Sequence, residues 1–325
     1  MQDRGSTLAP GFIFDSDMGR NIDAAFGLSM LYGLGRGRLI AVGISNPSLD
    51  AALFTETIAR FYNAGAGGVL PIGLAEDGPK VDDAPMLTAP LAMRNADGQP
   101  TFRRGIRDIG DTADPAVVFR NGLLTQQDKQ AIVILAGPDT NLARLLVLPR
   151  ARDIVAAKVR LLVIAAGMFN DGAADIRIRA DISSARRVFA DWPSPIVSVG
   201  LEAANITPFP DRSIETDFSV LANHPVVPAY RAYREKQDAR PGDLAVPGVL
   251  AVLYATNPDA NYFKLSSPGV ITVSDDGRAR FAESANGTRR YLVIDAAHKE
   301  TITQAFIAMA TVKAPTGRGT PPREF

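Results

Sequence analysis

The chain has 325 residues, of which 46% are hydrophobic and 22% are charged, a balance typical of globular proteins that bury a sizeable core. Its formal net charge is zero, so the charge balance does not support nucleic acid or a membrane surface as partner. The sequence contains no cysteine, which excludes disulfide bonds, thiolate metal ligands and cysteine nucleophiles. No apolar run is long enough to cross a bilayer.

The N-terminus is a short polar stub, Met1-Gln2-Asp3-Arg4-Gly5, that runs directly into an apolar segment. This start fits a cytoplasmic protein. It equally fits a mature secreted chain whose signal peptide has been removed. We favour the second interpretation, which places the protein in the periplasm.

The first part of the chain alternates between predicted strands and helices. A buried strand is expected at 11–14, a helix buried on most sides at 23–34, a second strand at 39–44 and a helix at 51–62. Residues 73–130 are rich in Pro, Gly and Asp, which indicates a long, partly irregular insertion near the site.

The same alternation returns after this insertion. Strands are expected at 131–135, 161–166 and 196–199, with a helix opening near Thr140. Repeated strand–helix units predict a Rossmann-like α/β fold with a mostly parallel sheet flanked by helices. Asp276-Gly277 between two β-like runs predicts a small C-terminal hairpin, and a last helix is expected at 297–312. We expect one domain over 1–313 and a disordered tail over 314–325.

Polar residues directly after the predicted strands mark the place to look for a site, because ligands of such sheets bind beyond the carboxyl ends of the strands. These residues are Asp15, Asp17, Asn46, Asp139, Thr140, Asn170 and Glu202. Glu202 either faces this pocket or forms a structural salt bridge. The two histidines, His224 and His298, do not follow a predicted strand, so we expect surface or capping roles for them.

The segment DSDMGRNID, which begins at Asp15, is the most informative stretch of the chain. It follows a strand and opens a helix, so its carboxylates should converge at the ligand edge of the sheet. Carboxylates there can hold a hard cation or activate a water molecule. The structural alternative is that Asp15 and Asp17 only cap the helix. Two acids on one such loop favour a functional role.

The segment resembles the signature of the inosine-uridine preferring nucleoside hydrolases, in which Asp-x-Asp-x-Gly is followed by Asp-Asp-Ala. LAGPDTNLARLL resembles the Gly-Pro-x-Thr-Asn motif of that family, and the stretch from Ala165 to Glu202 resembles its sugar-binding segment. SNPSLDAALFTETIARFY and PGVLAVLYATNPDANYFKLSSPGVITVSDDGR also resemble bacterial members. The likeness runs from about Phe12 to Met309 and implies the nucleoside hydrolase fold.

The resemblance implies hydrolysis of an N-ribosidic bond by a water molecule held on Ca²⁺, with a nucleoside or sugar as the small-molecule partner and a homodimer or homotetramer as the assembly. It gives Asp17 the role of general base and metal ligand. It gives Thr140 a backbone carbonyl bond to the metal. Substrate-binding roles fall on the following residues: Asp15, Asp23, Asn46, Asn170, Asp175, Arg177 and Glu202.

Departures from the family pattern fall on the metal ligands. Ala24 stands where the second acid of Asp-Asp-Ala is expected, and Gly248 stands where a late aspartate is expected. Asp243, five residues earlier, could supply the late ligand if that loop is rebuilt. Because calcium affinity follows the number of charged oxygen ligands, these losses predict weak calcium binding. Arg20 and Arg177 could carry part of the metal's charge if both point inward; otherwise Arg20 points to solvent.

Three functions are therefore open from the sequence. The first is an active hydrolase of N-ribosides with an altered metal site. The second is a catalytically silent relative that binds a nucleoside, a sugar or an anionic ligand. The third is a phosphatase with Asp15 as nucleophile, since FIFDSD is similar to the haloacid dehalogenase motif, but Gly19 stands where that motif carries Thr or Val.

Overall fold

A computed structural model describes residues 9–34, 38–62, 71–170, 172–221, 223–237 and 242–312. The strands form one sheet in the order β3-β2-β1-β4-β5-β6-β10-β8-β9, and β7 pairs with β10. The predicted tail, 314–325, lies outside the described residues. None of the helices in these ranges has the length and apolar character required to cross a membrane.

The first six strands run parallel, as the alternation of strands and helices predicts. The central strand, β1, pairs with β2 on one side and β4 on the other, so it is buried along its whole length. These strands are β1 (Gly11–Ser16), β2 (Arg38–Ile44), β3 (Ile72–Leu74), β4 (Ala131–Ala136), β5 (Val159–Ile164) and β6 (Ile196–Ser198).

The C-terminal strands extend this sheet with antiparallel pairs. The predicted hairpin is present as β8 and β9, and its turn contains Gly277 at φ 82°, a conformation that glycine adopts without strain. β10 joins the hairpin to the parallel part, because it runs parallel to β6 and antiparallel to β8. The strands are β7 (Phe263–Leu265), β8 (Gly269–Val273), β9 (Ala279–Glu283) and β10 (Arg289–Ile294).

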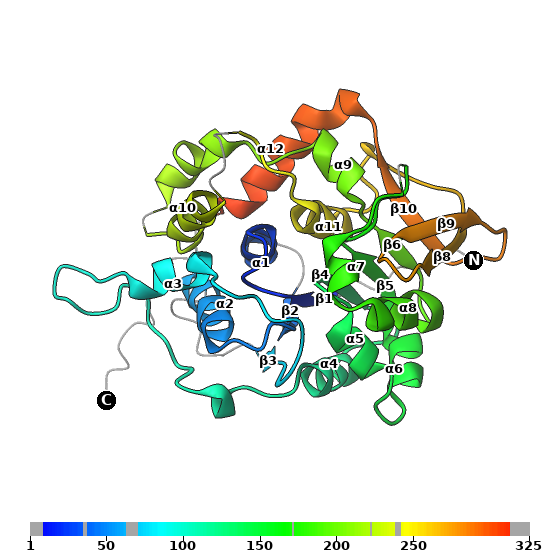
Figure 1. Cartoon of the computed structure of the whole chain (residues 1–325), viewed down its shortest axis with the longest axis horizontal. Helices are drawn as coiled ribbons and strands as arrows, with labels where there is room; N and C mark the ends of the chain where they lie inside the picture. Colours follow the sequence, from blue (N-terminus) through cyan, green and yellow to red (C-terminus); the bar gives the residue numbers. More distant parts are fainter. Residues whose placement is uncertain are drawn as a thin grey trace, which may run out of the picture.

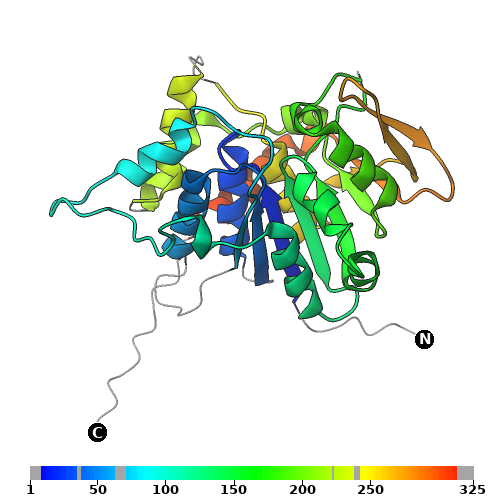
Figure 2. The same cartoon turned by 60° about the horizontal axis from the view of Figure 1, so that its bottom comes forward.

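Helices cover both faces of the sheet (Figures 1 and 2). One face carries α1 (Asp23–Gly33), α2 (Leu49–Tyr62), α3 (Pro85–Ala92), α9 (Leu201–Ile206), α10 (Val226–Lys236), α11 (Pro247–Thr256) and α12 (Lys299–Ala310). The other carries α4 (Pro115–Leu124), α5 (Thr140–Leu145), α6 (Ala151–Lys158), α7 (Ile176–Ala180) and α8 (Ile182–Asp191). Short 3₁₀ turns are η1 (Ile109–Asp111), η2 (Asp211–Ile214), η3 (Asp217–Val220) and η4 (Ala296–His298).

Alternate residues of the buried strands supply two separate cores. In β1, Phe12 and Phe14 pack in the core under α1, whereas Ile13 packs in the core under α4 and α5. Because successive side chains of a strand point to opposite faces, a strand covered on both faces must be apolar at every position. This is why GFIF reads as a continuous apolar run.

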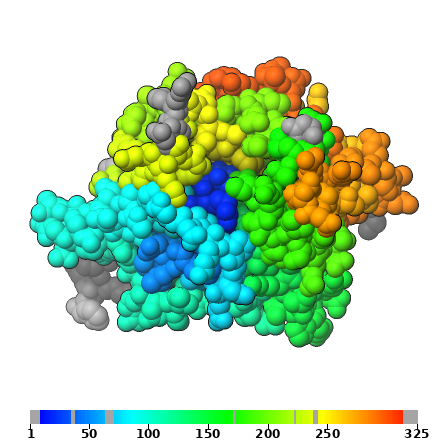
Figure 3. Space-filling view, in the orientation of Figure 1, coloured from blue at the N-terminus to red at the C-terminus, as the bar shows by residue number. Residues whose placement is uncertain are grey.

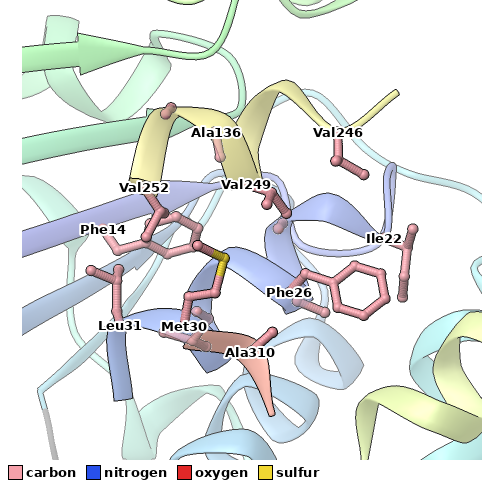
Figure 4. Packing of buried hydrophobic residues seen from close by; sticks show 14 of the residues in the cluster. Phe14, Ile22, Phe26, Met30, Leu31, Ala136, Val246, Val249, Val252 and Ala310 are labelled. Carbon is pink, nitrogen blue, oxygen red and sulfur yellow. The ribbon is translucent and has the colours of Figure 1, made fainter. Parts of the chain in front are cut away.

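Helix α1 lies between the sheet and two other helices, and this position explains its apolar sequence. Its residues from Asp23 to Leu31 are all buried. Figure 4 shows Met30 of α1 beside Ala310 of α12, Val252 of α11 beside Phe14 of β1, and Phe26 of α1 on the side toward Ile22. The predicted helix at 23–34 is thus confirmed, and its packing fixes the loop that precedes it.

Two sequence expectations differ from the structure. The segment 73–130 is more regular than expected, because Pro85 and Pro115 open the helices α3 and α4 instead of interrupting structure. His224 was expected at the surface, but it is 1% exposed; its Nδ1 accepts a hydrogen bond from the Val226 amide at the start of α10. The surface expectation for His224 is therefore wrong, and Pro225 is the N-cap residue of α10.

Candidate functional site

A cavity of about 260 Å³ lies at the carboxyl edge of the sheet, next to the β1–α1 loop. In Figure 3 the N-terminal segment, coloured blue, is visible in a hollow between surrounding segments coloured cyan, green and yellow. The cavity is lined by Asn21, Ile22, Asp23, Met168, Ala174, Asp175, Ile176, Arg177, Leu201, Tyr233, Leu244, Ala245 and Pro247.

Asp15 lies near the end of β1 and is fully buried. Its Oδ1 accepts a hydrogen bond from Asn141 Nδ2 at 2.9 Å, whereas Oδ2 has no partner among the described residues. Burial raises the pKa of Asp15 to about 7, because a charged carboxylate is poorly solvated there. Asn141 was missed as a site residue, although it is the last position of the Gly-Pro-x-Thr-Asn match.

Asp17 is also buried, and Arg20 binds it directly. Arg20 Nε lies 2.5 Å from Asp17 Oδ2, and the Arg20 side chain is only 20% exposed. Burial raises the pKa of Asp17, and the positive charges of Arg20 and Arg177 oppose this rise. Arg20 therefore points inward to Asp17, and the alternative that it points to solvent is wrong.

Asp23 and Arg177 form a buried ion pair at the wall of the cavity. Arg177 Nη2 lies 2.7 Å from Asp23 Oδ2, and the two side chains are 5% and 2% exposed. Burial disfavours a charged Arg177, but the carboxylates of Asp23, Asp175 and Asp17 outweigh this and raise the Arg177 pKa. The same Asp23 oxygen accepts the Gly248 amide hydrogen at 2.9 Å.

Gly248 and Ala24 surround this pair without contributing an oxygen from a side chain. A Cβ atom at Gly248 would lie 3.0 Å from Asp23 Oδ2 and 3.2 Å from the Ala136 Cβ. Its absence lets the main chain of α11 approach Asp23 closely enough for the amide hydrogen bond. Ala24 is fully buried in the apolar packing of α1.

These residues do not fit a calcium site of the kind that the family resemblance implies. Calcium takes about six to eight oxygen ligands, and its affinity rises with the number of carboxylates. Here one oxygen of Asp17 and one of Asp23 are bonded to arginines, and positions 24 and 248 carry no ligand atom in a side chain. Within the described ranges, no group of three or more His, Cys, Asp or Glu side chains could hold a metal ion.

Asp243, the proposed substitute ligand, lies elsewhere. It is exposed, its Oδ1 accepts the Asp211 amide hydrogen at 3.3 Å, and it lines a different cavity together with Tyr230 and Arg234. Its neighbours Leu244 and Ala245 line the site cavity instead. The loop before α11 therefore does not bring Asp243 to Asp17.

Three other predicted residues are held by hydrogen bonds near the cavity. Asn46 donates from Nδ2 to the Met18 carbonyl at 3.0 Å, and its Oδ1 accepts the Val81 amide hydrogen at 3.2 Å. Thr140 opens α5 and donates from its hydroxyl to Asp181 Oδ2 at 2.7 Å. Asp175 lines the cavity and caps α7, accepting the amide hydrogen of Arg177 at 2.7 Å.

Asn170 and Glu202 are placed less directly. Asn170 is exposed. Glu202 Oε1 accepts the Phe169 amide hydrogen at 2.8 Å, and its Oε2 has no partner in the described part of the chain. The cavity wall nearby is formed by Met168 and Leu201.

Asp139, one of the polar residues that follow a predicted strand, is a buried acid to which no role was assigned. It is 1% exposed, and its Oδ1 has no partner in the ranges that the structure covers. Burial and the nearby acids Asp181 and Asp15 raise the pKa of Asp139 well above its ordinary value. Its position directly after a predicted strand was the sequence feature that placed Asp139 near the site.

Several buried polar atoms converge at this edge without a partner in the described protein. Buried polar groups are almost always hydrogen-bonded, so such a cluster is where a ligand or water is expected. The set contains four acceptor oxygens and one donor nitrogen. Hydroxyl groups match such a set, because they both donate and accept hydrogen bonds. The atoms are Asp15 Oδ2, Asp17 Oδ1, Asp23 Oδ1, Asn141 Oδ1 and Arg177 Nε.

Comparisons with known proteins agree with this architecture. No curated protein matches the chain. Among solved structures, a plant nucleoside hydrolase is similar at 18% identity and a TM-score of 0.66, over 93% of this chain and 99% of its own. An inosine-uridine preferring nucleoside hydrolase from Bacillus anthracis is similar at 15% identity and a TM-score of 0.68, over 92% and 99%.

A purine-preferring ribonucleoside hydrolase from Gardnerella vaginalis is similar at 16% identity and a TM-score of 0.67, over 93% of this chain and 99% of its own. At such identities the structural likeness establishes the fold, which is the predicted nucleoside hydrolase fold. The family model of the inosine-uridine preferring nucleoside hydrolases matches residues 12–315. The chain therefore belongs to the inosine-uridine preferring nucleoside hydrolase family.

Proposed function

We propose that the protein binds a nucleoside or a related small riboside at this cavity and is a catalytically silent member of its family. The observation that carries the proposal is the pairing of two acids of the β1–α1 segment. Asp17, the expected general base, and Asp23 are each hydrogen-bonded to an arginine. An arginine paired with a carboxylate stabilises its unprotonated form, so Asp17 is a weaker base toward water than an unpaired carboxylate would be.

The size and charge of the cavity favour a small neutral ligand. Its volume of about 260 Å³ is below the range of ~300–1,000 Å³ typical of drug-sized ligands. Among the described residues, Arg177 supplies the one guanidinium at its wall, and the carboxylates of Asp23, Asp175 and Asp17 lie near it, so little positive charge is left for an anion. Sugar hydroxyls match this mixture of donors and acceptors better than a phosphate does.

Calorimetric titration tests whether the protein binds ribosides, and a hydrolysis assay tests whether it is catalytically inactive. We expect inosine, uridine or ribose to bind the full chain, with inorganic phosphate and ribose 5-phosphate binding more weakly. We expect release of p-nitrophenol from p-nitrophenyl riboside to stay at the rate without protein. If no nucleoside or sugar binds, the proposal of a binding site is overturned. Turnover of p-nitrophenyl riboside would overturn the proposal that the protein is catalytically silent.

Hydrolysis of an N-ribosidic bond is the second candidate, favoured by one observation. Asp17 Oδ1 and Asp15 Oδ2 are buried at the strand end without a partner among the described residues. Asp17 could take a proton from water while the water oxygen bonds to C1′ and the C1′–N bond breaks; the base would leave with a proton from solvent. This candidate predicts turnover that Asp17→Asn abolishes while nucleoside affinity is kept.

Assembly into a homodimer or homotetramer, which family membership suggests, stays a prediction. Light scattering on the eluting protein would measure the mass in solution, with 34.6 kDa expected for a monomer.

A further inference from the structure

We propose that the guanidinium of Arg177 takes the place of the calcium ion in this site, so that the site is complete without a divalent cation. The inference deepens the proposed function by naming the group that supplies the positive charge. It starts from the misfit between the implied metal and the residues present.

The surroundings of Arg177 are those of a bound cation. The side chain is 5% exposed, lies 2.7 Å from Asp23 Oδ2, and interacts with the charges of Asp175 and Asp17. A buried charge persists only where opposite charges and hydrogen bonds compensate its lost hydration. Three carboxylates around one guanidinium provide that compensation.

The positions of the missing ligands adjoin the same pair. The Gly248 amide hydrogen is bonded to the Asp23 oxygen that receives Arg177, and a Cβ atom at position 248 would lie 3.0 Å from that oxygen. Position 24 directly follows Asp23 in the chain. Neither position carries the carboxylate that the family pattern supplies, whereas Asp23 is bonded to the guanidinium of Arg177.

Charge balance gives an independent argument. Arg20 is bonded to Asp17, as Arg177 is to Asp23, so two positive side chains face two carboxylates. These four groups together are neutral without an added ion, and Asp175 adds one negative charge beside Arg177. A divalent cation bound among them would be repelled by two guanidinium groups at short range, which the loss of two carboxylates makes worse.

Thermal unfolding with and without calcium tests the replacement. The full chain is compared with Ala24→Asp/Arg177→Asn/Gly248→Asp, which restores the two acids and removes the guanidinium. The matched control is Ala24→Asp/Gly248→Asp, which restores the acids and keeps Arg177. Each protein is melted in EDTA, in excess calcium chloride and in the same concentration of magnesium chloride.

We expect calcium to leave the melting temperature of the natural chain unchanged and to raise that of the triple variant progressively with concentration, because an ion that binds only the folded state stabilises it. The control should respond much less. A calcium-dependent rise in the natural chain would overturn the proposal. So would equal behaviour of the triple variant and the control, whether both respond or neither does.

A second pair of variants controls for steric crowding that an aspartate at position 248 would cause beside Asp23. Ala24→Asp/Arg177→Asn and Ala24→Asp differ only at Arg177 and leave Gly248 unchanged, and the same difference in calcium response is expected. No nucleoside is present in these measurements. If the protein binds no riboside, these melts can still support the replacement of calcium by Arg177. If the natural chain responds to calcium, that replacement is contradicted, but the proposal of riboside binding is not.

Discussion

Two buried acidic regions of this protein differ in how completely their oxygens are used. Glu56 of α2 is 1% exposed and accepts hydrogen bonds from the amides of Gly105 and Ile106 and from Arg60 Nε at 2.8 Å. In the aspartate cluster, defined here as Asp15, Asp17 and Asp23, each side chain keeps one oxygen without a partner among the described residues.

The difference separates a structural acid from a site. Glu56 ties the loop at 105–106 to α2 and leaves nothing over for a ligand. The aspartate cluster is held by Asn141, Arg20 and Arg177, and its remaining oxygens have no partner among the described residues. Burial alone therefore does not distinguish the two regions; the proposed site rests on buried carboxylates that keep unused hydrogen-bonding capacity.

The largest effect is expected where a buried charge loses its partner. Arg177→Met keeps an extended apolar side chain but leaves the Asp23 carboxylate uncompensated, which should reduce the free energy of unfolding by about 3–5 kcal/mol. Urea unfolding measures this change. Adding Asp23→Asn should restore most of the loss, because the unpaired charge is then removed as well. A single variant as stable as the natural chain would mean that the pair is not formed.

The second prediction tests the structural side of the comparison. Glu56→Gln replaces an oxygen by an amide donor that faces backbone N–H groups, which should cost about 1–3 kcal/mol in urea unfolding. Nucleoside affinity should not change. Glu76→Gln, at an exposed position, is the control and should stay within about 0.5 kcal/mol. Loss of nucleoside affinity in the folded Glu56 variant would break the distinction between the two regions.

The third prediction uses a buried network outside the site. His224 Nε2 lies 2.8 Å from Tyr62 Oη, and burial lowers the His224 pKa from 6.5 to about 3. The unfolded chain then binds a proton that the folded protein does not, so stability is lost as pH falls from about 6.5 towards 3, by at most about 1.4 kcal/mol per pH unit. In His224→Gln this component should disappear from thermal melts recorded across that range. An unchanged slope would show that His224 is not the group responsible.

Much of the fold follows from local patterns in the sequence. The β1–α1–β2–α2 order is readable because each element is an apolar run of the right period, and Asp276-Gly277 defines its own hairpin. The prolines that open α3 and α4 are ambiguous, since proline both begins helices and interrupts structure. His224 was misplaced because its partner Tyr62 lies 162 residues away.

The sequence predicts that the three aspartates of the cluster lie together, but it does not predict which side chains bond to them. Asp15, Asp17 and Asp23 share one segment, so their convergence follows from a strand end followed by a helix start. Arg177 is 154 residues from Asp23, and only the tertiary fold brings their side chains to 2.7 Å. The place of Asp243 depends on an irregular loop, whose path the sequence does not specify.

The last prediction concerns Asp15, whose pH dependence has the opposite sign to that of His224, and it sharpens the comparison most. With its pKa raised from 3.8 to about 7, folded Asp15 keeps a proton that the unfolded chain releases, so this group makes the protein less stable as pH rises from about 4 to 7. Asp15→Asn still offers an oxygen to Asn141 and cannot titrate. Thermal melts should therefore show the variant gaining stability relative to the natural chain over this range.

The two pH variants also check each other, because the His224 and Asp15 components have opposite signs. Relative to the natural chain, His224→Gln should gain stability as pH falls from about 6.5 to 3, and Asp15→Asn should gain stability as pH rises from about 4 to 7. If Asp15→Asn instead follows the natural chain at every pH, Asp15 is charged when folded. The cluster would then offer a free carboxylate beside Asp17, and the hydrolytic candidate would gain over the silent one.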